Sequence, residues 1–415
     1  MNKYVFFTMN IGGINGAEQY IYNKVNFLRD KGYEVFIFSG RAEGILIDAF
    51  RQYEKYSNPA FRFFPYCLNR TELKSIISWI KSVIALQEND MCIIESSNVT
   101  SGLWGELIAK ELQCKHLEIN LTENHNYSRD MIDFLRFKLD RHELSGIMDD
   151  SVGKMIKEPN ITLREDMRAR AYCNNVVQKC EDHFSHLLDS SADYTFASIG
   201  RLEKEYVSLL LDQLKRYFTE HSEKRFNLLL IGGSADGRKL KDIELIFEEC
   251  KNVNLVLTGS LYPIPRDLVK HADLFVSASG SASVTYYEKV PTIRIHHVTA
   301  EPMGIIGYDY FLNNPVKPEP LKDRNLFDCI DQIINDDLQI EYIEDFEIEY
   351  IEKMYKEFSR HLHFGEEAQA AYYDTLSIHY TDILYRLCSY VSRVFGVKFA
   401  YAVLEMIRKL VRRTS

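Results

Sequence analysis

Hydrophobic and polar positions in the first half of the chain follow two different periods. Strands buried on both faces of a sheet have short, nearly continuous apolar runs, and this half contains KYVFFTM, YEVFIFSG, AFRFFPY, DMCIIES and KHLEINL. Between them lie longer stretches with helical spacing, such as GAEQYIYNKVNFLRDKG, ELKSIISWIKSVIALQ and GLWGELIAKELQ. This alternation predicts a parallel sheet that is covered by helices on both faces.

The same alternation starts again after about residue 190. Strand-like runs are YTFASIG, FNLLLIGG, VNLVLTG, DLFVSAS and VPTIRI, and they are separated by helical patterns such as EKEYVSLLLDQLKRYFTEH and RKLKDIELIFEECK. We therefore expect an α/β protein of two tandem doubly wound domains that face a cleft, with ligands at the carboxyl ends of the strands. The predicted limits are 1–188 and 189–345, followed by C-terminal helices at 346–415.

The last part of the chain, from about residue 384, has the pattern of an amphipathic and basic helical tail with a break at Gly396. Its basic residues face few acids and are Arg386, Arg393, Lys398, Arg408, Lys409, Arg412 and Arg413. Such a tail favours contact with an anionic membrane surface, because positive charge and an apolar face both contribute to binding. The alternative is a helix that docks on the protein core with its basic residues facing water.

Composition narrows the class of protein. A length of 415 residues suits two domains, and a net charge of −10 argues against a general nucleic-acid binder. The eight cysteines are scattered without a Cys-x-x-Cys pair, which is typical of reduced core residues in the cytoplasm. No apolar run approaches the roughly 20 residues that span a bilayer, and no leader pattern opens the chain. We expect a cytoplasmic protein, peripheral on the inner face of the membrane, with homo-oligomers possible.

The first strand runs into a glycine-containing loop, TMNIGGINGAEQYI. Gly12, Gly13 and Gly16 allow a tight turn and a close approach of the backbone to a ligand at the start of a helix. The spacing is not GxGxxG and no suitable acid follows about 20 residues later, which disfavours a dinucleotide fold. Glu18 lies in the first helical turn, where a carboxylate stabilises the helix dipole or has a function of its own.

These segments together resemble the GT-B nucleotide-sugar glycosyltransferases, particularly the large family 4 group. The resemblance rests on GGINGAEQYIYNKVNFLRDKGYEV near the start and on ASIGRLEKEYVSLLLDQL, LLLIGGSADGRKLKDI, NVNLVLTG and LVKHADLFVSAS in the second half. It covers most of residues 1–310 in the correct order. It implies two Rossmann-like domains of the GT-B type, with the donor on the second domain and the acceptor on the first.

The resemblance also implies roles for particular residues. The donor would be a UDP- or GDP-sugar, whose diphosphate needs positive charge as it leaves, and Arg201 and Lys204 are the candidates. The other donor-side candidates are Gly13, Gly232, Gly233, Ser279, Gly280 and Ser281, and the acceptor-side candidates are Gly16, Glu18 and Arg141. Plainer alternatives remain open. Arg201 and Lys204 could form surface pairs with neighbouring acids, and the glycines and serines could form ordinary turns.

The chain departs from the family pattern where a pair of glutamates is expected. Seven residues before Pro291 stands Val284, so the segment SASGSASVTYYEKVPTIRI offers a helix N-terminus for phosphate but lacks the glutamates at the family's positions, and we do not expect it to supply a catalytic acid or base. The remaining catalytic candidates are Glu123, His125 and Glu301, which follow strand ends; Glu301 could equally be a solvated loop carboxylate. No cofactor is expected to be tightly bound, and the lack of an Asp-x-Asp motif leaves metal dependence unpredicted.

The sequence therefore favours a glycosyltransferase. Its acceptor would be a lipid-linked or growing cell-surface glycan of the capsule, exopolysaccharide, lipopolysaccharide or teichoic type. Two alternatives stay open: a catalytically inactive GT-B partner that stabilises an active transferase or binds glycan, and a GT-B phosphotransferase acting on polyol phosphates.

Overall fold

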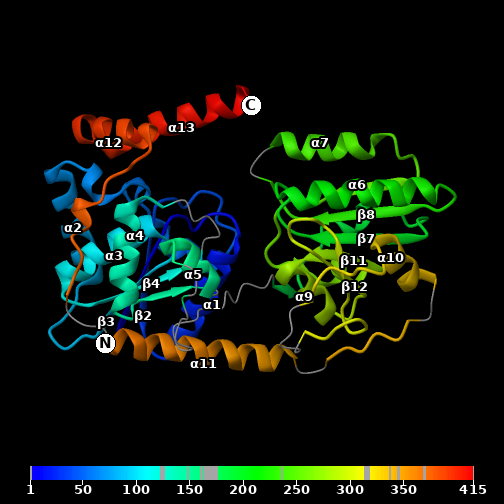
Figure 1. The fold of residues 1–415 in the computed structure, drawn as a ribbon, viewed down its shortest axis with the longest axis horizontal. Helices are drawn as coiled ribbons and strands as arrows, with labels where there is room; N and C mark the ends of the chain where they lie inside the picture. Colours follow the sequence, from blue (N-terminus) through cyan, green and yellow to red (C-terminus); the bar gives the residue numbers. More distant parts are fainter. Residues whose placement is uncertain are drawn as a thin grey trace. The chain divides into compact units, whose positions relative to one another are not determined.

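The chain folds into two compact units, seen in a computed structural model (Figure 1). Unit 1 comprises Met1–Tyr172 and Ile351–Ser415, and unit 2 comprises Cys173–Tyr350. The residues that the structure describes are 2–121, 127–146, 149–158, 161, 176–234, 237–312, 318–335, 338–343, 346–367 and 371–414. The predicted limits of 1–188, 189–345 and 346–415 set the C-terminal helices apart, whereas the structure groups 351–415 with unit 1.

Unit 1 is built on a parallel five-stranded sheet in the order β2-β1-β3-β4-β5. The strands are β1 (Lys3–Thr8), β2 (Glu34–Ser39), β3 (Cys92–Ser96), β4 (Lys115–Asn120) and β5 (Leu144–Gly146). The chain passes from β1 to β2 on one side and continues with β3 on the other. The direction of winding therefore reverses between β1 and β3, which is where ligands bind in open α/β sheets.

Helices cover both faces of this sheet. They are α1 (Gly16–Asp30), α2 (Arg70–Ile84), α3 (Val99–Leu112), α4 (Arg129–Asp140) and α5 (Asp149–Ile156). Their starts follow from local chemistry, because Asn69, Asn98 and Ser128 each accept a hydrogen bond from a free N–H of the first helical turn. Helix α1 ends before Gly32, whose φ of 78° suits the residue that follows a helix.

The segment AFRFFPY is not a strand, contrary to the sequence prediction. It lies in two 3-10 turns, η2 (Pro59–Arg62) and η3 (Pro65–Cys67), which follow the longer η1 (Asp48–Tyr56). A proline begins each of the two turns, since its ring fixes φ and it has no N–H to give to a sheet. The run is apolar because Phe61, Phe63 and Phe64 are fully buried under the helices.

The C-terminal helices return to unit 1. They are α11 (Phe346–Glu367), the short η6 (Thr375–Ser377), α12 (Ile383–Phe395) and α13 (Val397–Thr414). Phe358 of α11 is fully buried and meets the rings of Tyr20 and Phe27 on α1. The predicted break in the tail is confirmed, because Gly396 separates α12 from α13 with a φ of 86°.

Unit 2 has a six-stranded sheet in the order β13-β12-β11-β7-β8-β9, parallel except for β13. The strands are β7 (Tyr194–Ile199), β8 (Phe226–Ile231), β9 (Val253–Leu257), β11 (Leu274–Ala278), β12 (Thr292–Ile295) and β13 (Pro302–Ile305), and a separate small sheet pairs β6 (Val177–Gln178) with β10 (Ile264–Pro265).

The helices of unit 2 also lie on both faces of its sheet. One face packs against α6 (Glu205–Glu220), α7 (Gly237–Glu248) and α10 (Leu326–Asn335), and the other against α8 (Arg266–Lys270) and α9 (Ser279–Tyr287). The turn η5 (Ser185–Leu187) precedes β7. Two α/β units with parallel sheets confirm the predicted fold class. Within the described part of the chain, no helix has the length and apolar character to cross a membrane.

Candidate functional site

The winding of unit 2 reverses between β7 and β11, which are neighbours in the sheet while the chain continues from β7 to β8 on the other side. Arg201 follows the end of β7, and α9 begins at Ser279 directly after β11. The backbone N–H of Ile199 donates to Ser277 Oγ at 3.0 Å, so the two strand ends are tied together. The structure thus brings the Arg201 loop and the Ser279–Ser281 turn to one edge of the sheet.

Helix α9 starts abruptly at this edge. Ser279 has a φ of 53°, a left-handed conformation that is rare for serine and turns the chain directly from strand into helix. Its N-cap residue is Ala278, whose side chain cannot accept a hydrogen bond, and its first turn contains no acid. Backbone N–H groups and the positive end of the helix dipole consequently favour an anion at Ser279, Gly280 and Ser281.

Arg201 and Lys204 lie in the short loop that leads from β7 into α6. The Arg201 side chain is about half exposed, and its nearest acid is Glu203, 3.8 Å away between Nη1 and Oε1. An exposed pair at this distance contributes little, so the guanidinium is available to a stronger anion. Lys204 is the N-cap residue of α6, and its N–H donates to the Arg201 carbonyl at 3.3 Å.

Gly232 and Gly233 hold the Arg201 loop in place. A Cβ on Gly232 would lie 1.8 Å from the Gly200 carbonyl oxygen, and one on Gly233 would lie 2.3 Å from Ser260 Oγ. The carbonyl of Gly233 accepts the N–H of Leu202 at 3.0 Å. Both glycines therefore allow neighbouring strand ends to approach closely, and their contact with a donor stays a prediction.

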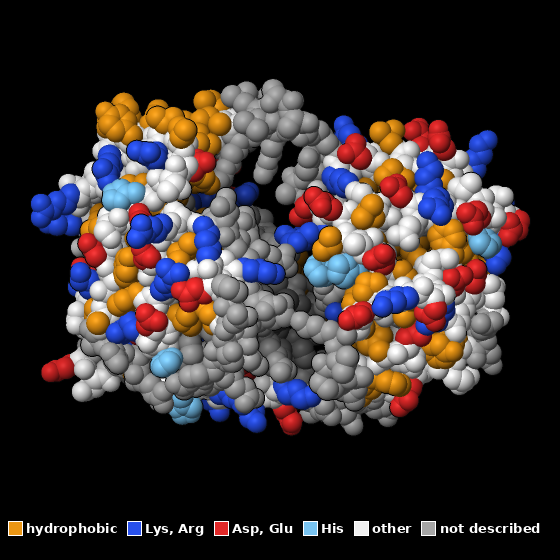
Figure 2. Space-filling view, in the orientation of Figure 1, with side chains coloured by type: hydrophobic (Ala, Val, Ile, Leu, Met, Phe, Trp, Pro, Cys, Tyr) orange, Lys and Arg blue, Asp and Glu red, His pale blue; other side chains and the backbone are white. Residues whose placement is uncertain are grey.

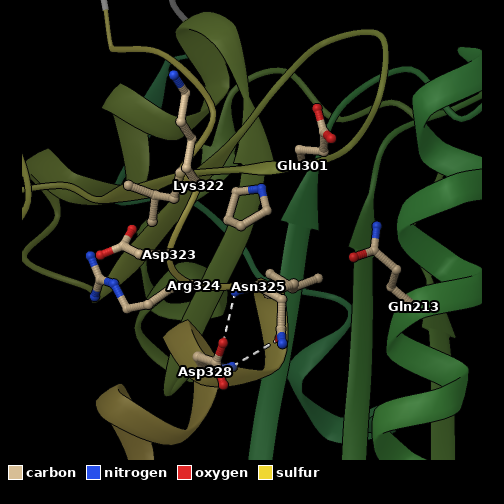
Figure 3. Close-up of a pocket in the computed structure, with 10 residues that line it drawn as sticks. Gln213, Glu301, Lys322, Asp323, Arg324, Asn325 and Asp328 are labelled. Atoms are coloured by element: carbon tan, nitrogen blue, oxygen red, sulfur yellow. Dashed lines mark hydrogen bonds between the residues drawn. The ribbon is translucent and has the colours of Figure 1, made fainter.

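Glu301 lines a pocket of about 420 Å³ on the α6 side of unit 2 (Figure 3). The other lining residues are Gln213, Pro302, Leu321, Lys322, Asp323, Arg324, Asn325, Leu326 and Asp328. Glu301 is exposed and accepts a hydrogen bond from Thr299 Oγ1 at 2.7 Å. Arg324 is held in an ion pair with Asp309, and Asn325 and Asp328 cap α10. The pocket is charged with both signs, and none of the predicted donor-side residues lines it.

The loop between β1 and α1 and the first turn of α1 together contain three of the predicted residues. Gly13 has a φ of 75° and its N–H donates to the Gly44 carbonyl at 2.7 Å, which packs the loop on a neighbouring turn. Gly16 is the first residue of α1. Glu18 is 4% exposed and accepts from the Asn15 N–H at 2.9 Å, so it stabilises the helix start. Their ligand contacts stay predictions.

Arg141 is the acceptor-side candidate that remains in unit 1. Arg141 precedes β5 and therefore lies at the amino edge of the sheet, where Nη2 donates to Glu143 Oε1 at 2.7 Å. The loops that bind ligands follow the opposite, carboxyl edge. Glu123 and His125 lie outside the described residues.

Polar residues at the carboxyl edge of unit 1 were not singled out from the sequence. At the reversal point between β1 and β3, Ser97 Oγ donates to Thr8 Oγ1 at 3.3 Å, and Asn120 at the end of β4 donates to Tyr127 OH at 3.2 Å. Burial raises the pKa of Tyr127 to about 12. The sequence feature that could have revealed these residues is a polar residue at the end of each apolar strand, as in IIESSN and LEINL.

Directly behind this edge, a chain of buried polar side chains links β3, β4, α3 and α4. Ser96 Oγ lies 2.6 Å from His116 Nε2 and 2.5 Å from Glu118 Oε2, while His116 Nδ1 lies 2.8 Å from Glu106 Oε2. Lys138 Nζ donates to the same Glu106 oxygen at 2.8 Å. All five are at most 2% exposed.

The pKa values of this cluster fix its protons. Burial raises the pKa of Glu118 to about 8, and burial with the Lys138 charge lowers that of His116 to about 4. Burial acts to raise the pKa of Glu106. The charge of Lys138 and the hydrogen bond with His116 outweigh the effect of burial, so the pKa of Glu106 is lowered to about 2.

At neutral pH, ionised Glu106 accepts from His116 Nδ1–H, so Nε2 must accept the Ser96 proton. Glu118 then donates its own proton to Ser96 Oγ through Oε2, and its Oε1 is buried without a hydrogen-bond partner. The cluster is too buried to meet a substrate, and it fixes the ends of β3 and β4.

On the opposite face of β3 lies a second buried ion pair, between Lys24 of α1 and Glu95. Lys24 Nζ also lies 3.1 Å from Tyr20 OH and 3.0 Å from His361 Nδ1 of α11. The pair therefore ties the returning C-terminal helix to the sheet. Within the described residues, no group of His, Cys, Asp and Glu is placed to hold a metal ion.

Comparison with solved structures identifies the fold. A glycosyltransferase from Rickettsia africae matches with a TM-score of 0.59 and 13% identity, over 88% of this chain and 98% of that one. HepE from Anabaena, solved in complex with UDP and glucose, matches with a TM-score of 0.50 and 12% identity, over 88% and 96%. These similarities confirm the predicted GT-B fold. No family model and no curated protein matches the sequence.

Proposed function

We propose that the protein is a glycosyltransferase that takes a sugar from a nucleotide-diphosphate donor held by unit 2. The observation that carries the proposal is the meeting of the Arg201 loop with the N-terminus of α9, which begins after Ala278 and has no acid in its first turn, at the reversal point of the unit 2 sheet. This edge offers helix N–H groups, serine hydroxyls and a guanidinium, which together suit a diphosphate.

The chemistry follows from the charge that leaves. When the bond between the sugar and the diphosphate breaks, negative charge builds up on the departing phosphate oxygen. The α9 dipole and Arg201 stabilise that charge without needing a proton transfer. UDP is the first nucleotide to test, since HepE, which has a similar fold, was solved with UDP and glucose; GDP is the second.

The acceptor binds to unit 1, at the edge where β1, β3 and β4 end. We propose a lipid-linked or growing cell-surface glycan at the inner face of the membrane, because hydroxyl and amide groups at that edge suit a sugar. The catalytic group is sought among Glu123, His125 and Glu301. Of these, Glu301 is the one within the described residues, at the edge where β12 ends.

Arg201→Ala tests the donor site. We expect the affinity for UDP, measured by titration calorimetry, to fall roughly ten- to a hundredfold, since a charge-assisted pair to phosphate is lost. Arg225→Ala is the matched control, because Arg225 is an exposed arginine at the start of β8, on the amino edge of the same sheet. Equal UDP affinity in both variants and the unchanged protein would refute the assignment of Arg201.

A catalytically inactive GT-B partner is the second candidate. It is favoured by the first turn of α9, which has no acid, and by Val284, which is 4% exposed where the family pattern has glutamate. Mass analysis after incubation with UDP-sugars and a lipid-linked acceptor distinguishes the two candidates. A product heavier by one sugar supports the transferase, and UDP binding without product or hydrolysis supports the partner.

A further inference from the structure

The helices α12 and α13 carry an apolar surface that faces away from the protein. Among the described residues, half of the large apolar side chains that are exposed fall between 383 and 406. We name them the tail face, and they are Ile383, Leu387, Tyr390, Val394, Phe395, Phe399 and Met406, each 53–74% exposed. Figure 2 shows the apolar side chains gathered over α12.

Helix α12 exposes its large apolar side chains and buries small and polar ones, which is the reverse of an ordinary surface helix. Its buried residues are the small Cys388, Ser389 and Ser392, whereas Leu387, Tyr390 and Val394 point outward at spacings of three and four. A surface helix in water normally buries its apolar stripe. The exposed stripe of α12 therefore calls for an apolar partner outside the chain.

The orientation of the two helices is held by polar contacts on their inner side. Arg393 donates to the Tyr66 carbonyl through Nε at 3.1 Å and Nη2 at 2.8 Å, and the Val397 N–H donates to Glu72 Oε1 at 3.1 Å. Arg62 Nη1 donates to Tyr401 OH at 2.8 Å. Rotation of the apolar stripe into the protein would break these bonds, so the tail face is a fixed surface.

The charge around the tail face selects its partner. Residues 383–414 contain seven Lys and Arg but one acid, Glu405, in a chain whose net charge is −10. Arg386 and Lys398 are exposed beside the apolar stripe. A second copy of this chain would oppose this surface with the same positive charge, whereas an anionic lipid surface complements it.

We propose that the tail face inserts into the interface of an anionic bilayer and lays α12 and α13 along it. The aromatic residues Tyr390, Phe395 and Phe399 suit the boundary between headgroups and acyl chains, and the Phe395 and Phe399 rings lie 5.4 Å apart across the Gly396 break. The proposal rests on the proposed function in that a bilayer holds the lipid-linked acceptor beside unit 1, on which both helices pack.

Co-sedimentation with vesicles tests it with the full chain and without nucleotide. The protein is expected to bind vesicles of phosphatidylglycerol and phosphatidylcholine in equal parts, and to bind phosphatidylcholine alone at least roughly tenfold more weakly. Raising the salt concentration weakens the binding to the mixed vesicles, because the charges are exposed and screened.

The variant that replaces Leu387, Val394 and Phe399 by Gln is expected to lose binding by roughly tenfold or more, because three inserted side chains are removed. Its control replaces Leu187, Leu209 and Leu245 of unit 2, which are also exposed, by Gln and keeps binding. All six side chains face solvent, so folding, followed by circular dichroism, stays unchanged.

Binding that survives the tail-face substitutions, or that falls equally in the control, overturns the proposal. So does a loss of self-association in sedimentation velocity with vesicle binding unchanged, since this assigns the tail face to a second copy. UDP affinity is measured on the same variant and is expected to stay unchanged. A failure of vesicle binding is thereby distinguished from a failure of the donor site.

Discussion

At the scale of single residues, the unit 1 core shows what a sequence pattern hides. His116 and Glu118 alternate with apolar residues in β4 and meet Ser96 and Glu106 only after β3, β4 and α3 pack together. Gly105 and Gly102 leave the room for them, since a Cβ would lie 2.5 Å from His116 Nε2 and 2.4 Å from Glu118 Oε2. The hydrogen-bonded partners in this cluster are 10–22 residues apart in sequence, so the spacing of residues along one strand or helix does not predict their contacts.

Glu118→Gln tests the proton that this cluster keeps. The unfolded chain loses the Glu118 proton near the ordinary pKa of 4.5, and the folded chain loses it near 8. The folded state therefore binds more protons in this window, and stability falls as the pH rises through it. Below pH 6.5 the lowered pKa of His116 has the opposite effect, so the interval from 6.5 to about 8 isolates Glu118.

The measurement is the thermal midpoint of tryptophan fluorescence, because both tryptophans, Trp79 and Trp104, lie in unit 1. The midpoint of the unchanged protein is expected to drop by several degrees between pH 6.5 and about 8, at about 1.4 kcal/mol per pH unit at most. The Gln variant keeps an uncharged amide and is expected to show a flat profile. An equal drop in both proteins would contradict a stored proton on Glu118.

At the scale of elements, apolar periodicity predicted those strands and helices that are long and regular. The apolar pattern gave the wrong element at 60–66, where the run forms 3-10 turns. The prolines that begin these turns are also compatible with the end of a strand, so the sequence did not distinguish the two structures. It did not show that α11 packs on α1, since that contact joins residues more than 300 positions apart. The helix is fixed there by the His361 contact with Lys24 and by the Phe358 ring.

Phe358→Ala measures how much α11 stabilises unit 1. The ring is fully buried between Tyr20 and Phe27, so its removal leaves a cavity and is expected to lower the free energy of unfolding by about 3–5 kcal/mol. Urea unfolding followed by tryptophan fluorescence reports the unit 1 transition. Ile351→Ala on the same helix is the control, because Ile351 is 40% exposed. Similar midpoints for the two variants would mean that α11 contributes little.

At the scale of the whole molecule, the sequence predicted the class of fold, and the structure brings two of the donor-side candidates, Arg201 and Ser279, to one edge of unit 2. Arg201 and Ser279 are far apart in sequence, yet each follows a strand that ends at the same reversal point, and strand order is what a family resemblance supplies. The sequence did not show at which end of its strand Arg141 would lie. Arg141 precedes β5 and therefore lies at the amino edge, and a pattern of charged residues around a strand does not distinguish its two ends. The acceptor role of Arg141 stays a prediction.

Hydrogen exchange of the full chain with and without UDP separates the roles of the two units. Nucleotide bound at the reversal point of unit 2 stabilises its surroundings, so exchange is expected to slow in peptides covering 199–204 and 278–284. Peptides covering β1 and β3 of unit 1 are expected to keep their rates, since the proposal assigns the acceptor and not the nucleotide to that edge. Arg201→Ala serves as the control and reduces the slowing in unit 2 at equal UDP concentration. Slowing confined to β1 and β3 would assign the nucleotide to unit 1 and reverse the proposed roles of donor and acceptor units.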